Sequence, residues 1–319
     1  MGLSFDTAYG DLAVLQCVAA LRTGDWRPAA GLLKETSGDW DRKAHRVDRL
    51  AEDADCHPAL AEWVAADRDN ADAHMVDAGA KVVQAWEIRG SSYARHVDKS
   101  AWAGFFAGLH DAQTALLSAI ERAPDDPTPW GISVLLARAL QMPRREFDAR
   151  WNELVRRDVG HVAGHHHALQ YLCAKWSGSH EEMFGFADRS SAEAPPGSPL
   201  HILPVYAAIE YAMAVRDGRV EGALESEFWE SARAVQAVEG AVERWETPAA
   251  ASGTPPHARA VPDRAHLAFA AAKIGAGAVA ARQYRAMGPY ASDMPWGAFV
   301  LWPKLAARAN RRRMLARHR

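Results

Sequence analysis

Apolar side chains recur every three to four residues along almost the whole 319-residue chain. This spacing puts the apolar residues on one face of an α-helix. The sequence contains no convincing run that alternates apolar and polar residues between hairpin turns, and no Asn-Gly or Asp-Gly pair joins two β-branched runs. The pattern therefore predicts an all-α fold without strands.

Local signals indicate where individual helices begin. Asp39 and Asn70 have side chains that can cap a helix N-terminus. Pro58 suits a first turn, because backbone N–H groups there have no partner within the helix and proline has none to leave unpaired. Ser179 and Glu182 form a Ser-x-x-Glu capping box ahead of an apolar run. We expect helices to begin at these positions.

Turn-rich segments recur at a nearly constant interval in the middle of the chain. Residues 121–127 are followed 34 residues later by 155–161, and 39 residues further on by 194–199. Each interval holds two helix-length apolar patterns, and 34 residues is the period of a tetratricopeptide helix-turn-helix unit. The spacing predicts a right-handed superhelical array of antiparallel helix pairs, of the tetratricopeptide type.

The chain is long for one compact core, so we divide it into four segments. Residues 1–98 form an N-terminal helical region, and residues 99–246 hold the tetratricopeptide-like pairs, with one long helix expected over 224–245. Residues 247–262 are rich in Pro, Ala, Gly and Ser and predict a linker or long loop. Residues 263–319 form a C-terminal helical cap, with helices expected from Asp263 and from Trp296 to the end.

Composition and charge limit the classes of partner. Apolar residues make up 49% and charged residues 24%, which is typical of a folded protein, and the net charge of −3 argues against a general affinity for nucleic acid. The tail 304–319 is different, with seven Lys or Arg and no acid; subtracting those seven charges from −3 leaves −10 for the rest. The tail either binds an anionic partner or forms a solvated last helix. We favour the solvated helix, and we expect no nucleic-acid partner, the tail being the only candidate.

No targeting, membrane or disulfide signal is readable. The N-terminus lacks a basic region followed by an apolar one, and no window reaches the ~18 apolar residues of a membrane span. Cys17, Cys56 and Cys173 are widely spaced and odd in number, without a CxxC pair. We expect a soluble, cytoplasmic protein with reduced thiols and no membrane span.

Several short strings resemble one family. Residues 86–90 (Trp-Glu-Ile-Arg-Gly), 123–130 (Ala-Pro-Asp-Asp-Pro-x-Pro-Trp), 175–179 (Lys-Trp-Ser-Gly-Ser), 186–187 (Phe-Ala) and 294–296 (Met-Pro-Trp) look like a family of bacterial tetratricopeptide-like proteins without assigned function. The resemblance covers about residues 60–300. It implies a helical-repeat fold and a binding function, with no catalytic residue to carry over. The Trp-Leu-Gly and Tyr positions of the generic repeat are not kept, which departs from strict repeat geometry.

The sharpest candidate for chemistry is a histidine cluster. His161 and His165 are one helical turn apart, a spacing that lets two imidazoles share a metal ion, with a third ligand from His180, Glu181, Glu182 or His201. The sequence is not HExxH, and histidine is also common at helix starts and in partly buried interfaces. We interpret the cluster as structural and predict no metal. The candidate ligand-binding residues are His161, His165, Trp176, Glu182 and His201.

Motifs of the common cofactor enzymes are missing. The sequence has no GxxxxGK[ST] loop, no GxGxxG after a strand and no GxSxG elbow, so we predict no cofactor. Asp125 and Asp126 are better read as turn residues that bond the local backbone. The twelve tryptophans are mostly expected in the core, although two or three could line a groove.

Two functions follow from this reading. The first is a non-catalytic interaction scaffold that binds a peptide or protein partner through a helical-repeat groove, the −10 body favouring a basic or extended segment. The alternative is a small-molecule-binding protein or enzyme with an inter-helix pocket near the His161/His165 face. Fold alone does not decide between them, because function depends on specific sites.

Overall fold

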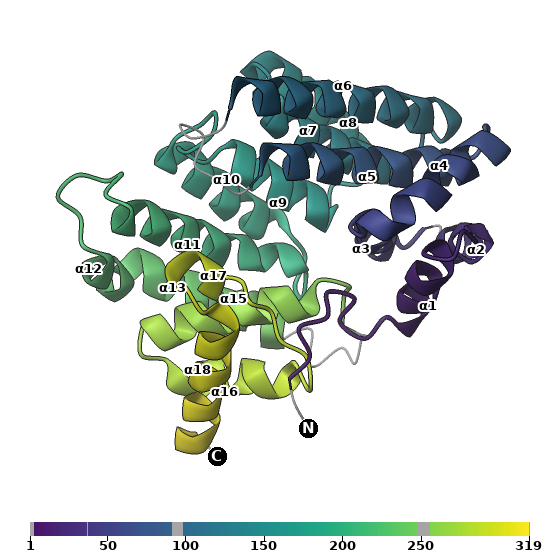
Figure 1. The fold of residues 1–319 in the computed structure, drawn as a ribbon. Coiled ribbons are helices and arrows are strands. Elements are labelled where there is room, and N and C mark those ends of the chain that lie inside the picture. The colour runs from purple at the N-terminus through teal and green to yellow at the C-terminus, as the bar shows by residue number, and fades with distance from the viewer. Residues whose placement is uncertain (1–2, 37, 91–97, 248–255, 319) are drawn as a thin grey trace. The chain divides into compact units, whose positions relative to one another are not determined.

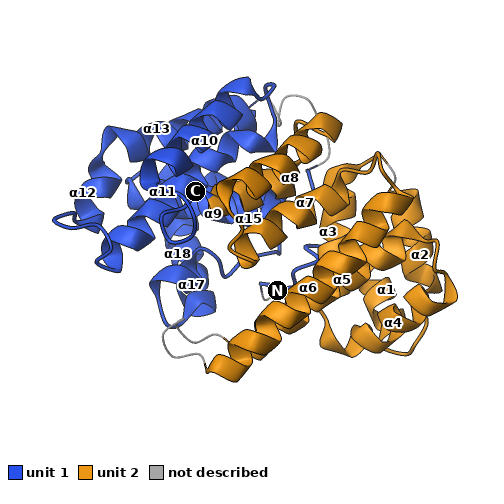
Figure 2. Cartoon of the chain, turned by 90° about the horizontal axis from the view of Figure 1, so that it is seen from above, with its two compact units in different colours: residues 1–10, 172–319 blue, residues 11–171 orange. Residues whose placement is uncertain are grey.

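A computed structural model of the chain describes residues 3–36, 38–90, 98–247 and 256–318. These residues confirm the all-α prediction: they form helices, and their β-type pairing is limited to an isolated bridge between Ser4 and Tyr290 (Figure 1). None of the described helices combines the length and apolar content needed to cross a membrane. The chain divides into two compact units, coloured in Figure 2: unit 2 is Asp11–Tyr171, and unit 1 joins Met1–Gly10 to Leu172–Arg319.

Unit 2 contains the first half of the helices. They are α1 (Leu12–Leu21), α2 (Arg27–Glu35), α3 (Trp40–Ala51), the short 3₁₀ turn η1 (Ala54–Cys56), α4 (His57–Ala66), α5 (Ala71–Arg89), α6 (Lys99–Arg122), α7 (Thr128–Ala139), α8 (Arg144–Arg157) and α9 (Val162–Tyr171). Helices α5 and α6 lie side by side (Figure 1). A Cβ placed on Gly108 would lie 3.1 Å from Ala85 Cβ, and one on Gly104 would lie 2.9 Å from Ile88 Cγ2. The residue number decreases along α6, from Gly108 to Gly104, while it increases along α5, from Ala85 to Ile88. The two helices are therefore antiparallel and in close contact at these glycines.

A buried lysine links helix α3 to α5 and to the turn ahead of α7. The Lys43 ammonium lies 2.6 Å from Asp72 Oδ1 in α5 and 2.6 Å from Asp126 Oδ2 ahead of α7, and its side chain is only 7% exposed. Asp126 also accepts the backbone N–H of Thr128 at 2.8 Å, as expected for a turn aspartate. Burial disfavours the charged form of Lys43, but its two aspartates outweigh this effect and raise its pKa.

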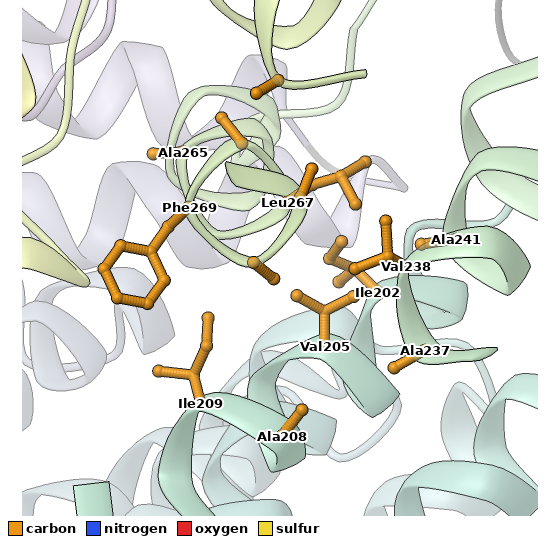
Figure 3. Packing of buried hydrophobic residues seen from close by; sticks show 14 of the residues in the cluster. Ile202, Val205, Ala208, Ile209, Ala237, Val238, Ala241, Ala265, Leu267 and Phe269 are labelled. Carbon is orange, nitrogen blue, oxygen red and sulfur yellow. The ribbon is translucent and has the colours of Figure 1, made fainter. Parts of the chain in front are cut away.

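Unit 1 contains the remaining elements. They are α10 (His180–Glu193), the 3₁₀ turn η3 (Pro199–Ile202), α11 (Leu203–Arg216), α12 (Glu225–Glu230), α13 (Ala232–Ala241), the π-helical turn η4 (Val242–Glu246), α15 (Ala260–Lys273), α16 (Gly277–Ala286), α17 (Trp296–Phe299) and α18 (Pro303–Arg317). Figure 3 shows side chains of α11, α13 and α15 meeting in its core, among them Val205, Val238 and Leu267. One face of α13 is therefore fixed by apolar packing, and its other face is available to line a pocket.

The predicted helix starts are confirmed where a cap was identified. Asp39 accepts the N–H of Arg42, Asn70 accepts the N–H of Ala73, and Ser179 accepts the N–H of Glu182. The repeated turn segments also separate elements as expected, since α6 ends at Arg122, α8 at Arg157 and α10 at Glu193. The right-handed superhelical, tetratricopeptide-like arrangement and the four-segment division remain predictions.

Three predicted helix boundaries are wrong. The expected helix over 224–245 breaks at Ser231, whose extended backbone lets its hydroxyl cap α13 by accepting the N–H of Ala234. The expected helix from Trp296 to the end breaks before Pro303, because the residue before a proline is disfavoured in the α conformation. Helix α15 begins at Ala260 instead of Asp263. Most of the predicted linker, residues 248–255, lies outside the described residues.

The Ser179 cap gives a local stability prediction. The Ser179 hydroxyl accepts the N–H of Glu182 at 3.0 Å, and the carboxylates of Glu181 and Glu182 lie in the first turn of α10, where the helix dipole favours negative charge. We expect S179A to lower the free energy of unfolding by about 1 kcal/mol, measured by urea denaturation. S179D, which restores a capping oxygen, is the control, and equal loss in both variants would contradict the capping role.

Candidate functional site

His161 and His165 lie at the start of α9, in the interior of unit 2. The His161 side chain is fully buried, and a Cβ placed on Gly131 would lie 2.7 Å from its Cε1. Its Nδ1 accepts the backbone N–H of Gly164 at 3.1 Å. The Nδ1 of His165 lies 3.0 Å from the carbonyl oxygen of His161, and its ring packs edge-to-face on Trp151. The Nδ1 atom of each ring is therefore used in a bond to the local backbone.

Burial controls the protonation of these two histidines. It lowers the pKa of both imidazoles to about 4, although Asp126 opposes the shift at His161 and Asp158 opposes it at His165. Both rings are therefore neutral at pH 7. Among the residues that the structure describes, no three His, Cys, Asp or Glu side chains are gathered to hold a metal ion. The geometry supports a role in fixing the start of α9.

The other three predicted residues belong to unit 1. Trp176 is half-buried in the turn before α10, and Glu182 is exposed on the first turn of that helix. His201 is buried in η3, with 2% of its surface exposed. His201 lines a polar pocket, which we describe next.

The polar pocket is a cavity of about 310 Å³ within unit 1. Helices α10 and α13 and the turns η3 and η4 supply its polar lining, which comprises Asp188, Ser191, His201, Arg233, Gln236 and Arg244. Gly240 belongs to the same wall, and a Cβ placed on it would meet no heavy atom within 4 Å. The wall of the pocket is therefore open at this position.

The polar pocket contains a chain of two hydrogen bonds in which each donor and acceptor can be assigned. His201 Nε2 lies 3.0 Å from the Pro195 carbonyl oxygen, which can only accept, so Nε2 carries the proton. Burial lowers the pKa of His201, and the Arg244 charge lowers it further, so the ring is neutral at pH 7. The unprotonated Nδ1 then accepts the hydroxyl proton of Ser191, 3.1 Å away. The lone pairs of the Ser191 oxygen are left to accept a hydrogen bond from outside the chain.

The two arginines of the polar pocket differ. Arg233 lies 2.6 Å from Asp188, an exposed ion pair. Arg244 is exposed, and no described carboxylate lies within 4.0 Å of its guanidinium group. With His201 neutral, two arginines and one aspartate give the lining a net charge of +1. The pocket therefore favours an anionic group.

A second polar cluster in unit 1 is buried and was missed at the sequence level. The Tyr206 hydroxyl donates to Asp263 Oδ1 at 2.7 Å, and His257 Nε2 lies 3.4 Å from Asp263 Oδ2. Burial raises the pKa of Asp263 to about 6 and lowers that of His257 to about 3. The available signal was Asp263 and His266, which lie three residues apart in an alanine-rich helix and so share one of its faces.

The C-terminal face is an exposed surface that combines apolar and basic side chains. We define it as Leu301, Trp302, Lys304, Leu305, Arg308 and Arg312. Leu301 is 92% exposed, Trp302 75% and Leu305 65%. Lys304 Nζ and Arg308 Cζ lie 5.6 and 5.2 Å from the centroid of the Phe5 ring, so the N-terminal segment packs beneath this face within unit 1. The unusual feature of this surface is that three large apolar side chains are mostly exposed to solvent.

Comparisons of the chain with protein-family models, curated proteins and solved structures found no match. The resemblance to bacterial tetratricopeptide-like proteins therefore stays a prediction.

Proposed function

We propose that the chain is a non-catalytic interaction protein whose C-terminal face binds a segment of a partner protein that carries both acidic and apolar side chains. The observation that carries this proposal is the exposure of Leu301 and Trp302, at 92% and 75%. A buried aromatic anchor flanked by aliphatic side chains is a common centre of a protein interface. Exposed apolar surface of this kind favours a partner that covers it.

The charge of the face selects the partner chemistry. Residues 294–319 contain seven Lys or Arg and no Asp or Glu. Leu305, Arg308 and Arg312 follow one another at spacings of three and four residues, so they share one side of α18. An acidic segment is complementary to this arrangement, whereas the −10 body of the chain favours basic segments elsewhere.

A protein partner fits the face better than a polyanion such as nucleic acid. Two of its cations already have contacts within unit 1, since Lys304 and Arg308 lie over Phe5. The neighbouring Arg311, outside the face, donates to the carbonyl oxygens of Tyr290 and Gly288. Binding to nucleic acid depends mainly on phosphate contacts by free cations, with little use for exposed leucine. The apolar anchors therefore favour a folded or helical protein segment.

Selection from a phage-displayed library of random 16-residue peptides tests this function. We expect the wild-type chain to enrich peptides that combine Asp or Glu with aromatic or aliphatic residues. The L301S/W302S variant should bind the enriched peptides at least about 30-fold more weakly, since truncating an interface anchor costs roughly 2 kcal/mol or more. Both side chains are exposed, so the variant should keep the stability of the wild type.

The matched control is V159S/L224S, which removes two other exposed apolar side chains, 74% and 57% exposed. It should bind the enriched peptides as the wild type does. Equal enrichment by L301S/W302S would contradict the proposal. So would binding to vesicles of anionic lipid, or to an RNA oligonucleotide, that is stronger than binding to any selected peptide.

A further inference from the structure

We infer that the polar pocket of unit 1 binds a small hydroxycarboxylate, a function separate from the proposed interaction at the C-terminal face. The pocket volume of about 310 Å³ lies at the lower end of the range for small-molecule sites. Its lining is mainly polar and charged, which suits a small polar ligand better than an apolar one.

The carboxylate of the ligand is recognised by arginine. Arg244 is exposed at the pocket and has no described carboxylate within ion-pair distance, while Arg233 is already held by Asp188. A guanidinium group binds a carboxylate through two parallel N–H donors. The net charge of +1 in the lining gives the same preference for an anion.

The hydroxyl of the ligand is recognised by Ser191. Its own proton is donated to His201 Nδ1, because the Pro195 carbonyl oxygen fixes the histidine proton on Nε2. The Ser191 oxygen can therefore only accept from the ligand, and a carboxylate without a donor cannot use it. A site built to receive a hydroxyl discriminates against the analogue that lacks it, because the buried acceptor then loses its partner.

Calorimetric titration with matched pairs of acids tests this inference. The pairs are lactate and propionate, malate and succinate, and citrate and tricarballylate, which differ within each pair by one hydroxyl. We expect at least one hydroxy acid to bind, and about tenfold more tightly than its deoxy partner. R244Q should weaken that binding by roughly 10- to 100-fold, the value of a charge-assisted bond.

Gly240 provides a matched pair of variants at one position. G240W should fill the pocket and abolish binding, whereas G240A should keep it, since the added Cβ of either variant meets no heavy atom within 4 Å. The inference is overturned if no hydroxy acid binds, if G240W binds as well as G240A, or if inorganic phosphate binds as tightly as the best hydroxy acid. L301S/W302S should leave acid binding unchanged, which separates this test from that of the proposed function.

Discussion

Replacing Lys43 by alanine should lower the free energy of unfolding of unit 2 by about 3–5 kcal/mol. The ammonium lies 2.6 Å from both Asp72 and Asp126, and the three side chains are 7%, 17% and 6% exposed. Removing the cation leaves two carboxylates with little solvent and no counter-ion at that position, and their desolvation is no longer compensated. Urea denaturation measures the loss.

Two further variants separate this charge effect from lost packing. The triple variant K43M/D72N/D126N removes all three charges and should recover much of the loss, because a buried ion pair replaced as a whole costs far less than one broken in half. R144A removes one partner of the exposed ion pair between Arg144 and Asp148 and should change stability by less than about 1 kcal/mol. Equal losses in K43A and the triple variant would show that packing, and not charge, is responsible.

The second large effect is loss of stability in mild acid. The pKa of His161 and of His165 falls from 6.5 to about 4 on folding, because burial disfavours the charged ring. Between pH 6.5 and 4 the unfolded chain therefore binds more protons than the native chain, and stability decreases as the pH falls through this window. At pH 5 each histidine should cost about 2 kcal/mol relative to pH 8, hence about 4 kcal/mol for the pair.

Urea denaturation at pH 8, 7, 6 and 5 measures this dependence. We expect nearly constant stability from pH 8 to 7 and a steep decrease from pH 6.5 to 5. In unit 1, the lowered pKa of His257 and His266 acts in the same direction, whereas the raised pKa of Asp263 acts against it. H165Q removes one of the two buried rings, so the slope of unfolding free energy against pH should fall by the equivalent of about one proton. Stability that stays constant down to pH 5 would show that these rings do not remain neutral when buried.

The helices of this protein were predictable because their signals are local. The apolar period and the caps at Asp39, Asn70 and Ser179 act within one or two turns, and the structure places helices at each of them. The breaks at Ser231 and Pro303 also had local signals, a capping serine and a proline. The apolar period continues across both positions, however, and favours an uninterrupted helix.

The polar contacts were not predictable, because they join residues far apart in the chain. Lys43 pairs with Asp126, 83 residues away, and Tyr206 donates to Asp263, 57 residues away. The sequence shows the residue types but not which helices bring them together. His201 was identified as a candidate, but its partner Ser191, ten residues earlier, was not, since their bond depends on the chain reversal between α10 and η3. Exposure of Leu301 and Trp302 likewise depends on how α17 and α18 pack.

Hydrogen exchange with a selected acidic peptide bound tests the proposed function most directly, because it reports where on the chain the peptide binds. We predict slower exchange of backbone amides in residues 300–312, and unchanged exchange around Val159 and Leu224, two exposed apolar residues outside the C-terminal face. Slower exchange confined to other parts of the chain, with residues 300–312 unchanged, would contradict a binding role for Leu301 and Trp302.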